Sequence, residues 1–117
     1  MITIVDYGMG NLGSMRNMFK RIGKKVTIES DPEKLALANK LVLPGVGSFD
    51  AAMSYINNTC GLRETLEHKA NAEKIPILGV CLGMQLLTKS SEEGELPGLG
   101  WIDAKTTRFP KQDGLKV

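Results

Sequence analysis

The chain has 117 residues, of which 42% are hydrophobic, and a formal net charge of +2 at pH 7. This length and composition are typical of one globular domain, and so small a charge argues against nucleic acid or an anionic membrane as a partner. Two cysteines, far apart in the sequence, indicate neither a disulfide framework nor a zinc site. We expect no signal peptide, no membrane span and a cytoplasmic protein with free thiols.

Strands and helices are predicted to alternate along the chain. Short apolar runs rich in β-branched residues predict strands at residues 2–5, 25–29, 40–43 and 75–80. Apolar spacing and caps predict helices at residues 12–22, from Pro32 with Asp31 as its cap, and at 49–56, 62–73 and 82–88. Residues 90–100 are expected to form a glycine- and acid-rich loop, and residues 101–109 an edge strand or part of a hairpin.

This alternation predicts an α/β fold of three layers, with a mostly parallel sheet covered by helices on both faces and a single domain over residues 1–117. In such sheets, ligands bind beyond the carboxyl ends of the strands. The loops that leave three of the predicted strands are glycine-rich, and they read DYGMGN, LPGVGSFD and GVCLGMQ. We therefore expect these three loops to lie at one edge of the sheet and to contain the functional site.

One of these loops also matches a nucleotide-binding motif. Residues 8–13 fit G-x-G-x-x-G between a strand and a helix, and Glu29 ends the next strand, where an acid would bind ribose. Two features argue against it: Asp6 and Tyr7 separate the strand from the first glycine, and the chain is too short for both mononucleotide-binding halves. We favour a glycine turn into a helix, and a dinucleotide-binding module remains an alternative.

The stretch around Cys81 is typical of a nucleophile held in a sharp turn between a strand and a helix. Gly79 and Gly83 give the pattern G-x-C-x-G, because larger side chains two positions away would collide across such a turn. The thiol would then lie exposed beside a helix N-terminus, which favours a negatively charged sulfur. The N–H of Leu82 would point into the same space as an oxyanion donor, and Gln85 would lie on the helix face below the sulfur. The alternative is that Cys81 fills the core, but a core has no need of two flanking glycines.

The loop over residues 44–47, Pro-Gly-Val-Gly, follows another predicted strand. Its glycines allow backbone N–H groups to turn toward a substrate at the same sheet edge. An ordinary strand-to-helix turn is the alternative, so this loop supports the site only together with Cys81.

The motifs GVCLGMQLL and LPGVGSFD closely resemble those of class I glutamine amidotransferases. Within that family, DYGMGNLGS, LPGVGSFDAAM, SSEEG and GLGWIDAKTTRF resemble the glutaminase subunits of imidazole glycerol-phosphate synthases in histidine biosynthesis. Amidotransferases that supply ammonia for bacterial surface-sugar synthesis share nearly the same motifs and are the alternative within the family.

The resemblance implies that Cys81 attacks the side-chain amide of glutamine and that ammonia leaves before water hydrolyses the thioester. It implies an oxyanion held by Leu82 N–H and by a backbone N–H at Val46 or Gly47. No metal and no organic cofactor are expected for this step.

The resemblance also implies how substrate and partner are bound. The residues that match substrate-binding positions of the family are Gly45, Gly47, Gln85 and Glu93, and Glu93 is expected to pair with the ammonium group of glutamine. Gly10 and Asn11 match positions that face the partner, a (β/α)₈-barrel cyclase subunit that receives the ammonia and forms a heterodimer with the glutaminase.

The chain departs from the family in its catalytic base. The family triad combines the cysteine with a histidine and a glutamate near the end of the domain, whereas the one histidine here is His68. It lies in the predicted 62–73 helix, on the side opposite the face marked by Leu62, Leu66 and Ala70, so we expect it on the surface. We therefore expect the 117 residues to be an N-terminal portion of the domain, with negligible glutaminase turnover alone.

Overall fold

The structure is a computed structural model, and it describes residues 1–9 and 12–108. Its strands are β1 (Ile2–Val5), β2 (Val26–Glu29), β3 (Leu41–Leu43), β4 (Ile77–Gly79), β5 (Ser90–Ser91) and β6 (Lys105–Thr106). Its helices are α1 (Leu12–Arg21), α2 (Pro32–Leu35), α3 (Phe49–Asn58), α4 (Leu62–Glu67), the π-helical η1 (His68–Ala72) and α5 (Leu82–Leu86).

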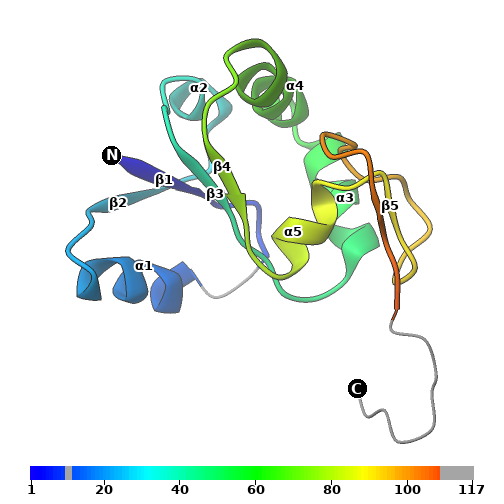
Figure 1. Cartoon of the computed structure of the whole chain (residues 1–117). Coiled ribbons are helices and arrows are strands. Elements are labelled where there is room, and N and C mark those ends of the chain that lie inside the picture. Colours follow the sequence, from blue (N-terminus) through cyan, green and yellow to red (C-terminus); the bar gives the residue numbers. More distant parts are fainter. Residues whose placement is uncertain (10–11, 109–117) are drawn as a thin grey trace, which may run out of the picture.

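The main sheet has four parallel strands in the order β2-β1-β3-β4. Helix α1 lies on one side of this sheet, and α2 and α4 lie on the other (Figure 1). The predicted α/β fold with helices on both faces is therefore confirmed. Because all four strands are parallel, their carboxyl ends meet at one edge, where the three glycine-rich loops begin.

The two faces of the sheet are covered to different extents. On one face, Val5, Leu41 and Leu43 are buried in a large core with side chains of α2, α3, α4 and α5. On the other face, Ile4 and Val42 contact Phe19 of α1 in a smaller core. Leu78, whose neighbour across the ladder is Val42, keeps 55% of its surface exposed on the α1 side. The large core thus holds the site-bearing α5, and the smaller one holds α1.

Helix ends agree with the sequence signals in two places. Asp31 caps α2, because its carboxylate accepts the Glu33 N–H at 3.0 Å. Helix α1 ends at Arg21, and Gly23 follows with φ of +78°, as a glycine after a helix commonly does. Ile22, which the helical spacing assigned to α1, lies beyond that end and is 64% exposed.

The predicted 62–73 helix changes character halfway. Its first part is α4, and its second part is η1, in which the Glu73 N–H donates to the His68 carbonyl five residues earlier. A π turn holds more residues than an α turn, so the buried face shifts along the sequence. Leu66 is buried as predicted, but Ala70 is only half-buried and Lys69 takes the interior position.

The end of the described chain differs from prediction. Residue 109 of the predicted 101–109 strand lies outside the described residues, and of residues 101–108 only 105–106 form β6. β6 is an edge strand, as one of the two predictions had it, but it pairs in parallel with β5, so the hairpin alternative is wrong. Parallel pairing requires a crossover, which residues 92–104 provide. Residues 90–100 are mainly loop, as predicted, apart from the two residues of β5.

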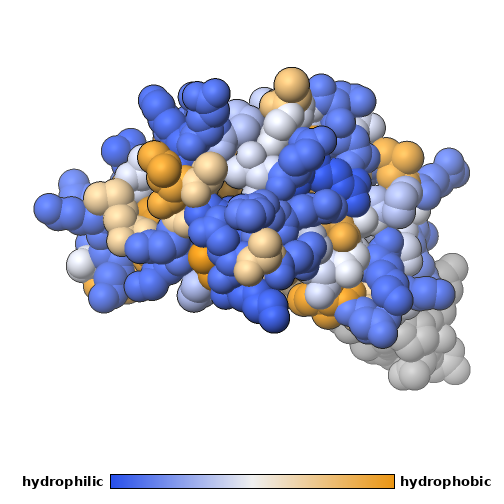
Figure 2. Space-filling model, turned by 90° about the horizontal axis from the view of Figure 1, so that it is seen from above, coloured by the Kyte–Doolittle hydropathy of each residue, from blue (hydrophilic) through white to orange (hydrophobic). Residues whose placement is uncertain are grey.

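Viewed from above, the surface is mainly hydrophilic, and hydrophobic residues form small separate groups on it (Figure 2). Within residues 1–9 and 12–108, none of the helices is both long and apolar enough to cross a membrane.

Candidate active site

Cys81 occupies a strained turn at the carboxyl end of β4. The strand ends at Gly79, α5 begins at Leu82, and Cys81 has φ of +54° and ψ of −117°, a combination that L-residues rarely adopt. Its side chain is exposed, and its thiol forms no disulfide. The predicted sharp strand-to-helix turn with an exposed sulfur is therefore present, and a cysteine that merely fills the core is excluded.

The two flanking glycines are required by close contacts. A Cβ on Gly79 would lie 2.8 Å from Met84 Cα and 2.9 Å from the Gly83 carbonyl oxygen, which confirms the expected collision across the turn. A Cβ on Gly83 would instead collide with the carbonyl of Leu43 at the end of β3. Gly83 is therefore needed for close approach to the neighbouring strand, a reason that the sequence pattern did not show.

The loop over residues 44–47 lies directly against this turn. The Leu82 N–H donates to the Gly45 carbonyl at 3.1 Å, so it does not point into open space as predicted. Gly45 is buried, and a Cβ there would lie 3.1 Å from Leu82 Cβ. Val46 is 60% exposed, and Gly47 has φ of +114°. Among the residues that the structure describes, no acceptor is found for the N–H of Val46 or of Gly47.

Tyr7 contacts the 44–47 loop from the interior of the protein. Its side chain is fully buried, and its hydroxyl donates to the Pro44 carbonyl. Burial raises the pKa of this phenol far above its ordinary value, because the interior disfavours the phenolate. Tyr7 is one of the two residues that separate β1 from the glycines of residues 8–13, and its side chain is part of the core.

A hollow of about 260 Å³ opens beside Cys81. One wall is formed by the 44–47 loop and Val80, and the other by α1, through Ser14, Met15 and Met18. Met18 is 51% exposed. Helical spacing places Met15 on the core-facing side of α1 and gives no sign that the same helix borders the cysteine.

On the α5 side of the turn, polar side chains form a connected cluster. Gln85 Nε2 donates to Glu93 Oε2 at 3.3 Å, and Gln85 Oε1 accepts the hydroxyl of the buried Ser91 at 3.0 Å. The Ser91 hydroxyl oxygen in turn accepts the Glu93 N–H at 3.1 Å. The structure thus brings together Gln85 and Glu93, two predicted substrate-binding residues, and adds Ser91, which the sequence analysis did not identify.

The neighbouring Glu92 has a different environment. Its carboxylate accepts the Arg108 N–H at 2.8 Å, and its own N–H donates to the Thr106 carbonyl at 3.0 Å. Glu92 therefore joins the loop to β6, whereas the carboxylate of Glu93 extends toward α5. The structure thus gives Glu92 and Glu93 different contacts, which the sequence alone does not distinguish.

Asp50, in the first turn of α3, holds the same loop. Its Oδ1 accepts the N–H groups of Glu95 and Leu96, each at 2.9 Å, and its Oδ2 lies 3.0 Å from the Glu95 nitrogen. These hydrogen bonds, from Leu96 first and then Glu95, lower the pKa of the Asp50 carboxyl. Asp50 lies in the motif LPGVGSFD, but only the fold shows its contact with residues 45 positions away.

His68 is far from the reactive turn in the topology. It belongs to η1, which precedes β4, whereas Cys81 follows the carboxyl end of that strand (Figure 1). Its side chain is 65% exposed, and its Nε2 lies 3.4 Å from Glu73 Oε2. The predicted surface position is confirmed, and His68 is not placed to serve Cys81 as a base.

Two predicted site residues, Gly10 and Asn11, lie outside the described residues. Their expected contact with a partner therefore stays a prediction.

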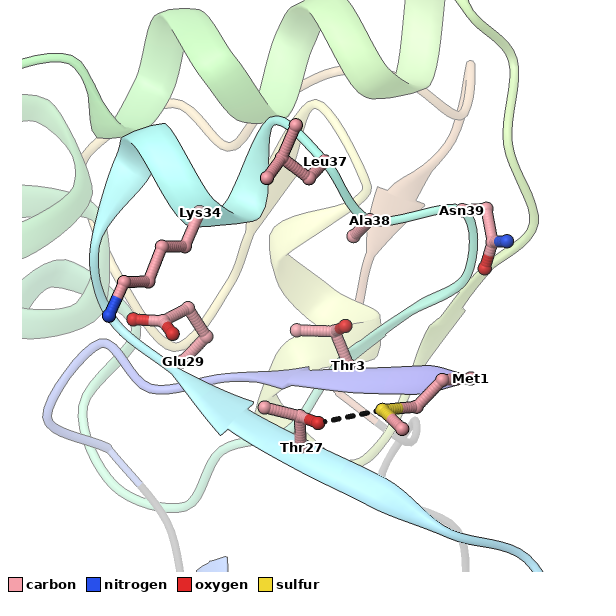
Figure 3. Close-up of a pocket in the computed structure, with 8 residues that line it drawn as sticks. All are labelled: Met1, Thr3, Thr27, Glu29, Lys34, Leu37, Ala38 and Asn39. Atoms are coloured by element: carbon pink, nitrogen blue, oxygen red, sulfur yellow. Dashed lines mark hydrogen bonds between the residues drawn. The ribbon is translucent and has the colours of Figure 1, made fainter.

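A second hollow, of about 270 Å³, lies between α2 and the strands β1 and β2. Figure 3 shows the Thr27 hydroxyl donating to the Met1 sulfur there, with Glu29 and Lys34 at the opposite end. Glu29, the acid of the dinucleotide alternative, lines this hollow, but none of the residues predicted for the glutaminase site does, so the candidate active site is the edge around Cys81.

The comparisons with known proteins agree with this choice. The family pattern described as glutamine amidotransferase class-I matches residues 3–112. The chain is 53% identical, over its whole length, to the protein named imidazole glycerol phosphate synthase subunit HisH 2 of Methanococcus maripaludis, and covers 57% of that protein. It is 47% identical to the HisH subunit of Bdellovibrio bacteriovorus, where the match includes 99% of this chain and 56% of that protein.

A solved structure described as a glutamine amidotransferase superposes with a TM-score of 0.75 at 20% identity, over 92% of this chain and 57% of that one. This likeness supports the fold. The chain spans little more than half the length of the relatives it matches. The family match favours the amidotransferase interpretation over dinucleotide binding, since it includes the loops around Cys81 and Gly45. From its first strand to residue 112, this chain belongs to the class I glutamine amidotransferase family.

Proposed function

We propose that this chain carries the nucleophile and the substrate-binding loops of a glutaminase that supplies ammonia for imidazole glycerol-phosphate synthesis. The observation that carries the proposal is the exposed thiol of Cys81 on a strained turn in a class I amidotransferase chain. The pathway and the partner, a cyclase subunit, rest on the names of relatives such as the HisH subunits of M. maripaludis and B. bacteriovorus.

In the proposed reaction, Cys81 Sγ attacks the side-chain amide carbon of glutamine. A C–S bond forms, and the carbonyl electron pair moves to the oxygen. When the intermediate collapses, the C–N bond breaks and the nitrogen leaves as ammonia with the proton that came from the thiol. Water then attacks the thioester, which gives glutamate and returns the thiol.

The oxyanion requires a rearrangement of the 44–47 loop. Leu82 N–H is engaged by the Gly45 carbonyl, so it can donate to an oxyanion only after that hydrogen bond opens. The carbonyl of Gly45 and the N–H of Val46 belong to one peptide unit and point in opposite directions. Rotation of this unit would therefore release Leu82 and turn a second donor toward the same place.

Glu93 and Gln85 are proposed to hold the substrate. Glu93 carries an exposed carboxylate that the Gln85 amide already contacts, and such a group suits the α-ammonium of an amino acid. The resemblance of the motifs around them to those of the family implies the same role for both residues.

The histidine of the family triad has no counterpart at the site, because the one histidine of the sequence, His68, lies in η1 beside Glu73. We propose that turnover requires a histidine supplied from outside these 117 residues, and that the chain alone releases ammonia at a negligible rate. We also propose a cytoplasmic location, the compartment in which free thiols are usual.

Covalent labelling tests the proposal, with Cys60 as an internal control, because it too is an exposed free thiol. A chloroketone analogue of glutamine should label Cys81 with saturable kinetics, and added glutamine should protect it. Cys60 should react slowly and without saturation, and Cys81→Ala should leave only that reaction. Equal reaction at both cysteines, or no protection by glutamine, would contradict the proposal. An ammonia-release assay on the same preparation checks the turnover, and robust release would refute the need for an external base.

A further inference from the structure

The loop that carries Glu93 is exposed, and its position depends on a few polar contacts. It follows the two-residue strand β5 and precedes β6, so the main sheet does not hold it. Before Glu93, the chain is fixed by the buried Ser91, whose hydroxyl contacts both Glu93 N–H and the Gln85 amide. What fixes the chain after Glu93 decides whether its carboxylate has one position or many.

After Glu93, the Gly94 N–H donates to the Ser91 carbonyl at 3.1 Å, and the first contact with another helix comes from Asp50 of α3. Both of its carboxylate oxygens accept the Glu95 N–H, and Oδ1 also accepts the Leu96 N–H. Carboxylates bind backbone N–H groups in this way at helix caps, and charge makes such hydrogen bonds strong. The anchor thus acts two and three residues past Glu93 in the chain, and it comes from a residue 45 positions before Glu95.

Gly94 allows the loop to approach the start of α3 closely. A Cβ at this position would lie 2.8 Å from Phe49 Cδ1 and within 3.1 Å of the Asp50 carboxyl carbon. The backbone next to Glu93 therefore rests directly on the start of α3. Its φ is not among the positive ones, so the glycine is needed for space and not for conformation.

We propose that Asp50 is a positioning residue, which, on the proposed function, fixes the loop so that the Glu93 carboxylate recognises the α-ammonium group of glutamine. Asp50 touches no reacting atom. It acts through the backbone of residues 94–96, and it links the 44–50 segment that borders Cys81 to the group that selects the substrate.

The test measures recognition of the ammonium group apart from thiol reactivity. Two chloroketones are used, the glutamine analogue and the same compound without its amino group, and the rate constant for labelling of Cys81 is measured by mass spectrometry. Their ratio is the ammonium selectivity. Labelling by chloroacetamide reports the intrinsic reactivity of the thiol.

We expect Glu93→Gln to remove most of the selectivity, about fivefold or more. Asp50→Ala should lower it by about threefold or more while the chloroacetamide rate stays within twofold of that of the unmodified chain. Asp50→Asn keeps one acceptor oxygen, so its ammonium selectivity should lie between that of Asp50→Ala and that of the unmodified chain. The matched control is Asp31→Ala, which also removes a carboxylate from a backbone N–H, at α2, and should keep the full selectivity.

Gly94→Ala provides a second route, because its added Cβ would lie 2.5 Å from Asp50 Oδ1 and so disturb the anchor without removing the carboxylate. It keeps the test valid if Asp50→Ala does not fold. It should lower the selectivity as Asp50→Ala does. If Glu93→Gln loses selectivity but Asp50→Asn and Gly94→Ala keep it, the role of Asp50 is overturned and the proposed function stands. If the unmodified chain shows no selectivity and Glu93→Gln equals it, the proposed substrate site itself is overturned.

Discussion

Strand β4 has a non-glycine residue with a left-handed φ on each side, and the two differ in what surrounds them. Lys74, before the strand, has φ of +56°, and Cys81, after it, has φ of +54°. Lys74 is exposed, next to Glu73, which pairs with His68 and with Lys69. Cys81 lies between Gly79 and Gly83, and a Cβ on either glycine would collide with backbone atoms. A left-handed φ is common to both ends, so it does not by itself mark a functional site.

The contacts around Cys81 are what distinguish it. Gly83 approaches the carbonyl of Leu43, and the Leu82 N–H bonds the Gly45 carbonyl, so the turn is fixed to β3 and to the loop after it. Backbone that is held from several sides can keep an unfavourable conformation, which costs about 1–3 kcal/mol. The reactive end of β4 is thus held by neighbouring elements at several points. At the other end, the Ile75 N–H donates to the Lys69 carbonyl of η1, and the Pro76 carbonyl accepts the Leu41 N–H of β3.

The largest expected effect on stability comes from disrupting the contact of Gly83 with the Leu43 carbonyl. Gly83→Ala places a methyl group against the Leu43 carbonyl, which the sheet prevents from moving away. We expect a loss of about 3 kcal/mol or more in the free energy of unfolding, measured by urea denaturation. Gly23→Ala is the matched control, because nothing lies within 4 Å of its added Cβ and only its φ is unfavourable. It should cost about 1 kcal/mol, and an equal loss in both variants would mean that the contact with β3 is unimportant.

Relieving the strain at Cys81 should have a smaller effect of opposite sign. Cys81→Gly removes the penalty for its φ and ψ, and we expect the free energy of unfolding to rise by about 1–2 kcal/mol while thiol labelling at this position disappears. Cys81→Ala is the comparison, because it also removes the sulfur but keeps the Cβ. If both variants are equally stable, the turn stores no strain.

Much of this end of the sheet is predictable from the sequence, because local signals carry it. The pair Gly79 and Gly83 around Cys81 indicates a tight turn, and β-branched runs predict the parallel strands. The contact of Asp50 with residues 95 and 96, and that of Gly83 with Leu43, depend on how distant elements meet, and no local pattern encodes them. The same limit explains η1: apolar spacing predicts one continuous helix, and only the fold shows the π turn that buries Lys69.

A change at Tyr7 removes a hydrogen bond to the 44–47 loop while the residues of the Cys81 turn stay unchanged. Tyr7→Phe leaves the buried Pro44 carbonyl without its donor, and we expect a loss of about 1 kcal/mol in the free energy of unfolding at pH 7.

The effect of this change should depend on pH. Because burial raises the pKa of Tyr7, its contribution is full below the unfolded value of about 10 and is lost as the pH rises from there toward the raised pKa. Urea midpoints measured from pH 7 to pH 11 should therefore converge for the two proteins above pH 10. Curves that stay parallel over this range would show that the phenol is not protected by the fold.

The smallest expected effect is at the other end of β4. Lys74→Gly relieves a left-handed φ but adds chain entropy to the unfolded state, so the two terms nearly offset and we expect a gain of about 0.5 kcal/mol or less. Labelling of Cys81 by the glutamine analogue should not change, because Lys74 lies at the amino end of the strand. A change in that labelling would mean that the two ends of β4 are mechanically coupled. An unchanged rate would show that the backbone at Lys74 does not contribute to the reactivity of Cys81, which depends on the turn that β3 and the 44–47 loop hold in place.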